Sequence, residues 1–254
     1  MTKVGIYAIL RVNGTVFDDA MAQSIFKNTL LLIGLITSIY GVIGAIGAER
    51  LRRFVGFMVL SSVGTLLIAI AMFNTQAWSA ALYYLVHSTL IAAAFYLFCG
   101  WITAQRGTFK DHLKVAPKIK NEKAAALTYF LIAMMMAGLP PFSGFLGKVF
   151  ILQATAETAY QGWIIAIILI VSLLSILALT RVGFILFWRA SPPEIDPNEA
   201  AYQTYQGLPA YAPNRNDTAI YIILAGLMAY VVFASPIQTY TVLTAQQIQN
   251  HALY

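Results

Sequence analysis

The chain has 254 residues, of which 59% are hydrophobic and only 10% charged, and its formal net charge is +6. Soluble domains carry about 25% charged residues. This composition, with a mean hydropathy of +0.73, therefore excludes an ordinary soluble domain and predicts a protein embedded in a lipid bilayer. The basic residues lie in short loops between apolar segments, which argues against a nucleic-acid-binding surface and is typical of loops that orient a membrane protein.

The sequence offers no site for a cofactor or a metal ion. It contains no CxxC, HExxH, GxGxxG or Walker-type motif, and its three histidines are widely separated. The single cysteine, Cys99, lies among apolar residues and cannot form an internal disulfide, so we expect it to be a packing residue. We therefore expect no cofactor, no metal site and no enzyme active site.

Six apolar segments are long enough to cross a bilayer, which requires about 20 residues in a helix. Each segment is continuously apolar, unlike the alternating pattern of transmembrane barrel strands. The predicted fold is therefore an all-α polytopic bundle of transmembrane helices. The predicted helices cover about 29–48, 54–73, 78–102, 124–155, 162–188 and 218–236.

The two ends of the chain are predicted to differ from these six helices. Residues 1–12 contain an apolar run that is too short to span the bilayer, so we expect a partial helix and a chain that begins within it. The membrane domain then covers 1–236, and 237–254 is a tail. The Pro- and Tyr-rich segment 189–217 is predicted to be an irregular connection without a site.

Basic residues predict the orientation of the bundle, because they accumulate in short cytoplasmic loops. The turn at 49–53 contains three arginines, the loop at 103–123 contains six basic residues, and the connections at 74–77 and 153–161 contain none. We expect a multi-pass protein of the bacterial inner membrane with both basic loops in the cytoplasm. The tail, which also lacks lysine and arginine, is expected outside.

The sequence AGLPPFSGFLGKVFIL, residues 137–152, predicts a broken helix. Pro140 and Pro141 interrupt an otherwise apolar run, and Lys148 follows within the same run. Broken helices with a nearby charge are typical of transport paths, because freed backbone groups at membrane depth must face protein or water. Lys148 is thus a candidate ion-path residue; alternatively, its long side chain reaches the headgroups.

His87 lies near the middle of the 78–102 segment. Histidine exchanges protons near neutral pH, and the hydroxyls of Ser88 and Tyr84 are placed to support such a relay. The alternative is a neutral histidine that joins two helices by a hydrogen bond.

Lys3 precedes the short apolar run VGIYAILRV. If apolar residues preceded it in a longer chain, Lys3 would lie within the membrane; as a free N-terminus it would be solvated.

Five separated motifs occur along the chain in the order TKVGIYAILRV, AERLRRFVGFMVLSSVG, ALYYLVHSTLIAAAFYLF, AGLPPFSGFLGKVFIL and SILALTRVGFILFW. Together they resemble the C-terminal half of the antiporter-like subunits shared by Mrp-type cation/proton antiporters and respiratory complex I. The pairing of YYLVHSTL with SGFLGK most resembles the D subunits of the Mrp (Mnh, Pha) antiporters.

This resemblance implies about fourteen transmembrane helices in two inverted repeats, of which this chain matches the last six and part of the eighth. It also implies a hydrophilic axis in which Lys3 corresponds to the lysine of the eighth helix, His87 to the polar residue of the eleventh, and Lys148 to the lysine of the broken twelfth. The family's further lysine is absent from HSTLIAAAFYL, which leaves His87 as the proton carrier there. Its glutamate and lysine on the fifth and seventh helices would fall before Met1.

The resemblance thus implies a membrane subunit of a multisubunit Na+/H+ antiporter that carries part of the ion path and assembles with other membrane subunits. Two alternatives remain. The chain belongs to a proton-pumping quinone oxidoreductase or hydrogenase complex, or it is a structural remnant that moves no ion.

Overall fold

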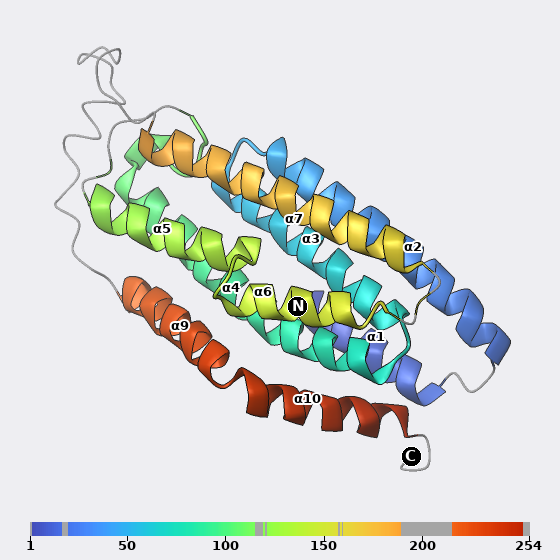
Figure 1. Cartoon of the computed structure of the whole chain (residues 1–254). Helices are drawn as coiled ribbons and strands as arrows, with labels where there is room; N and C mark the ends of the chain where they lie inside the picture. Colours follow the sequence, from blue (N-terminus) through green and yellow to red (C-terminus); the bar gives the residue numbers. More distant parts are fainter. Residues whose placement is uncertain are drawn as a thin grey trace, which may run out of the picture.

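The computed structural model of the chain describes residues 2–16, 20–114, 119, 121–156, 158, 160–188 and 215–250. These residues form nine α-helices, two short helical turns and one isolated β-bridge. The predicted all-α helix bundle is confirmed (Figure 1). The α-helices are α1 Thr2–Val16, α2 Ala20–Ile46, α3 Leu51–Ala71, α4 Thr75–Gln105, α5 Glu122–Ala137, α6 Ser143–Gln153, α7 Gln161–Gly183, α9 Arg215–Val232 and α10 Ala234–Gln249. The short turns are η1 Gly107–Phe109 and η2 Phe184–Trp188.

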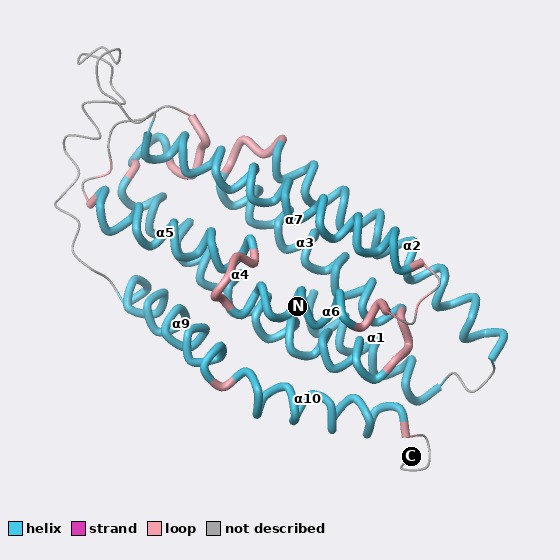
Figure 2. Tube along the Cα trace, in the orientation of Figure 1, coloured by secondary structure: helices cyan, strands magenta, loops and turns pink. Residues whose placement is uncertain are grey.

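Four helices in the described part of the chain are long and apolar enough to cross a membrane, and a fifth span results if α9 and α10 are taken together across their 80° bend. The predicted long helix at 124–155 consists instead of two shorter ones, α5 and α6, separated by the predicted break (Figure 2). The four spans are Gln23–Ile46, Leu51–Ala71, Thr75–Gln105 and Gln161–Trp188.

The C-terminal segment differs from the expected tail. Residues 234–249 form α10, which lies along α4 and contacts α1. Thr241 is hydrogen-bonded to Ser79 at 2.8 Å, and Thr75 donates to Gln249. The helix α10 is rich in Gln and Thr and buries one narrow stripe, Thr241, Ala245 and Ile248. The predicted connection 189–217 lies almost entirely outside the described residues.

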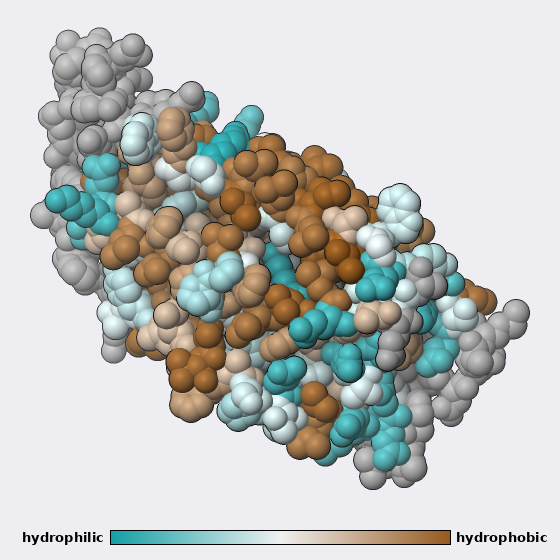
Figure 3. Space-filling view, in the orientation of Figure 1, coloured by the Kyte–Doolittle hydropathy of each residue, from teal (hydrophilic) through white to brown (hydrophobic). Residues whose placement is uncertain are grey.

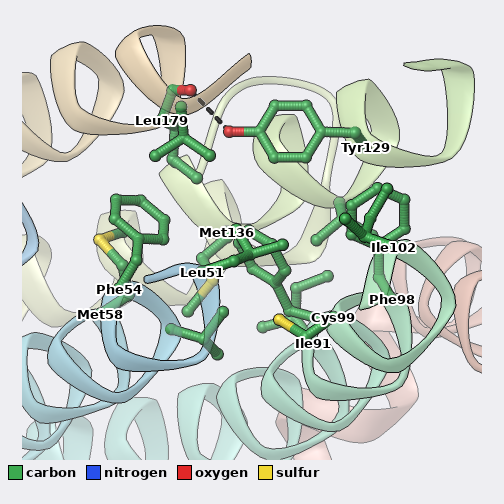
Figure 4. Packing of buried hydrophobic residues seen from close by; sticks show 14 of the residues in the cluster. Leu51, Phe54, Met58, Ile91, Phe98, Cys99, Ile102, Tyr129, Met136 and Leu179 are labelled. Carbon is green, nitrogen blue, oxygen red and sulfur yellow. Dashed lines mark hydrogen bonds between the residues drawn. The ribbon is translucent and has the colours of Figure 1, made fainter. Parts of the chain in front are cut away.

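The main hydrophobic core fills the centre of the bundle between α3, α4, α5 and α7. Figure 4 shows Phe54 from α3, Phe98 and Cys99 from α4, and Tyr129 from α5 packed together, and all four are buried. The Tyr129 hydroxyl donates to the backbone oxygen of Leu179 at 2.6 Å, which joins α5 to α7. Cys99 is therefore a packing residue, as predicted.

The helices α2 and α3 form the most extensive helix pair in the described structure. Glycines bring the two backbones together: a Cβ on Gly64 would lie 2.7 Å from the Cα of Ser38, and a Cβ on Gly41 would lie 2.7 Å from the Cα of Ser61. Such distances leave no room for a side chain. Gly44 likewise allows the Phe57 ring of α3 to approach α2, whereas Gly47 has only its own helix within 4 Å.

The two basic loops meet at one end of the bundle. Arg50 forms a β-bridge with His112, and the backbone N–H groups of Leu51 and Leu113 donate across the same contact, each at 2.8 Å. Arg106 is buried beneath this loop and donates to the backbone oxygens of His112 and Lys114 at 2.7 and 2.9 Å. Burial lowers the pKa of Arg106 to about 10, which leaves the guanidinium charged at neutral pH. The two loops therefore lie on the same side of the membrane, as their shared basic character predicts.

Much of the outer surface is apolar. The space-filling view shows hydrophobic residues over the middle of the bundle and hydrophilic residues toward its two ends (Figure 3). Leucine and isoleucine side chains of α2 and α7 stand exposed on this surface, including Leu32, Ile36, Leu173 and Leu177. This exposure is costly in water but ordinary in lipid, in agreement with a multi-pass membrane protein.

Candidate functional site

Lys3 contacts two helices through its ammonium group. The Nζ atom donates to Ser62 Oγ of α3 at 2.7 Å and to Ser88 Oγ of α4 at 2.8 Å. The lysine is therefore turned into the bundle and bound to neutral hydroxyls, in contrast to a solvated chain terminus.

Lys148 spans the break between α5 and α6. Its Nζ atom donates to the backbone oxygen of Ala137 at 2.7 Å and to Ser172 Oγ of α7 at 3.0 Å. Ala137 is the last residue of α5, and its carbonyl is one of those that the break frees. A cation at this end of a helix also meets the negative end of the helix dipole. Lys148 thus compensates the break and does not extend to the headgroups.

A glycine and two prolines interrupt the helix at the predicted break. Gly138 ends α5 in the left-handed conformation with φ of 76°, and its N–H returns to the carbonyls of Met134 and Met135. Pro140 and Pro141 follow, and α6 begins at Ser143. Both prolines are exposed and neither lines the cavity described below, so they shape the break without contacting that cavity.

His87 is buried on α4 opposite the start of α6, with 1% of its surface exposed. Its Nδ1 atom is hydrogen-bonded to Ser143 Oγ at 2.8 Å, and the ring also faces the backbone carbonyl of Met135. Tyr84 stacks on the imidazole with ring centroids 5.9 Å apart. His87 therefore joins α4 to both sides of the break.

A small polar cavity of about 20 Å³ connects these groups, and a volume of this size is enough for one water molecule. Tyr84, His87, Ser88 and Lys148 line it directly. Lys3 reaches the cavity through Ser62 and Ser88, which are both its hydrogen-bond partners and part of the lining. The structure thus brings all three predicted ionisable residues to one site. The remaining lining residues are Met58, Ser61, Ser62, Thr65, Ile91, Met136, Val171, Ser172 and Ser175.

Sequence reasoning did not identify the hydroxyl residues that α3 and α7 contribute to this cavity. Ser61, Ser62 and Thr65 come from α3, and Ser172 and Ser175 come from α7. The available signal was the clustering of hydroxyl residues within apolar segments. That signal is weak, because serine and threonine in membrane helices often bond only to their own backbone.

The described residues that line the cavity include no carboxylate, and the lysine ammonium groups donate to serine hydroxyls and to one backbone carbonyl. Over the described ranges, no cluster of three or more His, Cys, Asp or Glu side chains is placed to hold a metal ion. The chemistry available to this site is proton exchange between amines, an imidazole, hydroxyls and water.

Gly144 permits the close approach of α6 to His87. A Cβ at this position would lie 2.5 Å from the Met135 carbonyl oxygen and 2.7 Å from His87 Nε2. We expect Gly144→Ala to displace the imidazole and to destabilise the protein by about 1–3 kcal/mol, because the new methyl group overpacks this contact. The temperature at which the protein unfolds in detergent measures this. Gly162→Ala is the control, because nothing lies within 4 Å of that position, and equal losses in both variants would contradict the prediction.

Comparison with known proteins places these observations in a family. The sequence profile described as "NADH:quinone oxidoreductase/Mrp antiporter, TM" matches residues 1–176. The chain is 32% identical over 210 residues to a protein of Bacillus subtilis (strain 168) that is named as the D subunit of an Na(+)/H(+) antiporter, covering 82% of this chain and 41% of that protein. It is 31% identical over 218 residues to the D subunit of a probable K(+)/H(+) antiporter of Rhizobium meliloti (strain 1021), covering 74% and 40% respectively.

Solved structures have the same fold. A chain of the Mrp complex from Dietzia sp. DQ12-45-1b superposes with a TM-score of 0.79 at 22% identity, covering 98% of this chain and 51% of that one. A chain of respiratory complex I from Thermus thermophilus superposes with a TM-score of 0.67 at 16% identity, covering 90% and 46%. The chain thus spans less than half the length of these curated relatives. Because the profile matches well over half of its residues, the chain belongs to the NADH:quinone oxidoreductase/Mrp antiporter transmembrane family.

Proposed function

We propose that this chain acts within a multisubunit Na+/H+ antiporter and carries part of its proton path through Lys3, His87 and Lys148. The observation that carries the proposal is their convergence on one cavity: His87 and Lys148 line it, and two of its hydroxyls hold Lys3. Tyr84 and Ser88 support the path from α4, while Pro140 and Pro141 support it by creating the break that Lys148 spans.

Electrostatic coupling among these groups provides the mechanism. Lys148 and His87 line the same cavity, and Lys3 reaches it through Ser88, the neighbour of His87 in the chain. At an effective dielectric constant of about 20, unit charges about 8 Å apart interact by roughly 2 kcal/mol, which shifts a proton equilibrium more than tenfold. Protonation of one of these three groups therefore disfavours protonation of the next one. In the assembled antiporter, these charge states link proton entry to the efflux of Na+ or another monovalent cation.

The proposal includes a location and partners. The chain lies in the bacterial inner membrane with its basic loops in the cytoplasm and its C-terminus outside, and it assembles with other antiporter subunits. The paired basic loops at one end of the bundle support this orientation. The names of the curated relatives support the antiporter assignment.

Exchange assays on everted vesicles that contain the complete complex test this proposal. With a pH gradient established independently, addition of Na+ should dissipate the gradient without any electron donor. We expect Lys3→Ala to reduce this response to the level of vesicles that lack the complex, because the relay loses one of its proton carriers. A normal response in Lys3→Ala would contradict the proposed path. Proton movement that requires quinone reduction would instead indicate a proton-pumping quinone oxidoreductase or hydrogenase complex.

A further inference from the structure

We propose that Ser62 and Ser172 are positioning residues that hold the two lysines of the path while allowing each to lose its proton. This inference rests on the proposed function. It concerns two residues on two different helices, α3 and α7, and each contacts one lysine: Ser62 Oγ lies 2.7 Å from Lys3 Nζ, and Ser172 Oγ lies 3.0 Å from Lys148 Nζ.

The hydroxyls around Lys3 are oriented as acceptors. Ser62 donates its own proton to the backbone oxygen of Val59 at 2.7 Å, and Ser88 donates to that of Leu85 at 3.1 Å. Each hydroxyl has one proton to donate, so both oxygens present lone pairs to the ammonium. This arrangement fixes a charged Lys3 at the edge of the cavity without a carboxylate.

A hydroxyl partner differs from a carboxylate or carbonyl partner once the lysine is neutral. A carboxylate would favour the ammonium form and retain the proton, and a backbone carbonyl cannot donate to the lone pair of a neutral amine. A serine can rotate its O–H and become that donor. Of the two partners of Lys148, the Ala137 carbonyl can only accept an N–H from either form, whereas Ser172 can accept from the ammonium and donate to the neutral amine. Serines at these positions therefore keep each lysine in place throughout a proton-transfer cycle.

The same cavity provides matched controls. Ser61 is adjacent to Ser62 on α3, and Ser175 lies one turn after Ser172 on α7; both are buried and both line the cavity. Ser175 donates to the backbone oxygen of Val171 at 2.7 Å. Among the described residues, neither Ser61 nor Ser175 is a hydrogen-bond partner of Lys3 or Lys148. Removing either hydroxyl changes the polarity of the cavity without removing a lysine contact.

The test compares Ser62→Ala and Ser172→Ala with Ser61→Ala and Ser175→Ala in the complete complex in everted vesicles. Loss of a hydrogen bond to a charged group should lower the maximal exchange rate about tenfold in the first pair, with the half-saturating Na+ concentration unchanged. Ser61→Ala and Ser175→Ala should lose distinctly less of the rate than the first pair, because each of them keeps every lysine contact. Ser62→Thr and Ser172→Thr, which retain the hydroxyl, should recover most of the rate.

Exchange rates are divided by the amount of assembled complex. If an alanine variant does not assemble, Ser62→Cys or Ser172→Cys is used in its place. Near-normal rates in the first pair would overturn the inference. Equal losses in both pairs, or no recovery with threonine, would also overturn it, because they indicate a general need for a polar cavity. Lys148→Ala in the same vesicles separates the two proposals. If Lys148→Ala retains exchange, the proposed function fails. If Lys148→Ala is inactive while Ser62→Ala and Ser172→Ala are active, only the serine assignment fails.

Discussion

Replacing Lys148 with alanine is expected to abolish Na+-dependent proton exchange in everted vesicles while the complex still assembles. The substitution removes the only ammonium group among the residues that line the cavity, and it leaves the Ala137 carbonyl at the end of α5 without that partner. A positioned group that gives and takes a proton contributes about 10²-fold or more to a rate, so exchange should fall to the background. The decay of a preset pH gradient after Na+ addition measures the effect.

Two further substitutions establish what Lys148 contributes. Lys148→Arg retains the positive charge and the ability to donate, but arginine does not release its proton near neutral pH, so exchange should remain absent. Lys123→Ala removes an exposed lysine near the start of α5, away from the cavity, and should leave exchange unchanged. Full activity in Lys148→Arg would show that a fixed charge suffices, and the relay role of Lys148 would then be wrong.

Replacing Gly64 with alanine is expected to cause the largest loss of stability among single methyl additions to this bundle. The new Cβ would lie 2.7 Å from both the Cα of Ser38 and the backbone oxygen of Gly34, so α2 and α3 would have to separate. Overpacking of this kind costs about 1–3 kcal/mol, and backbone atoms cannot move aside as a flexible side chain can. The temperature at which the protein unfolds in detergent should fall.

Labelling of the buried Cys99 on heating measures this loss of stability. Cys99 is the only cysteine in the chain and has 0% of its surface exposed, so a thiol-reactive fluorophore labels it when the core opens on heating. Gly100→Ala is the control, because nothing lies within 4 Å of that position and alanine favours a helix over glycine by about 1 kcal/mol. Labelling curves that shift equally in the two variants would show that the close approach of α2 and α3 does not limit stability.

The broken helix was predictable from the sequence, since two prolines and a glycine in an apolar run leave few alternatives. The site was predictable only in part. Ionisable residues are rare at membrane depth, so Lys3, His87 and Lys148 were visible as candidates. Their partners were not, because a serine that accepts a hydrogen bond from a lysine and a serine that bonds only to its own backbone look alike in a sequence. Ser62 and Ser61 are neighbours, yet only Ser62 contacts Lys3.

The C-terminal helix α10 is a second feature that the sequence did not reveal. Its glutamines and threonines lower its hydropathy below that of a membrane span, and residues 237–254 were expected to form a tail beyond the membrane domain. The structure shows a helix whose polar side chains meet polar side chains of α4, as in the Ser79–Thr241 and Thr75–Gln249 pairs. Hydropathy averages over a helix and therefore does not detect such pairing between faces.

The bond from Lys148 to the Ala137 carbonyl has a mechanical consequence. On the proposed path, the ammonium group of Lys148 is both a proton carrier and the donor that joins the end of α5 to α6. Loss of its proton would remove the charge from this hydrogen bond and weaken it. The connection between the two half-helices would then be weaker with a neutral Lys148 than with a charged one.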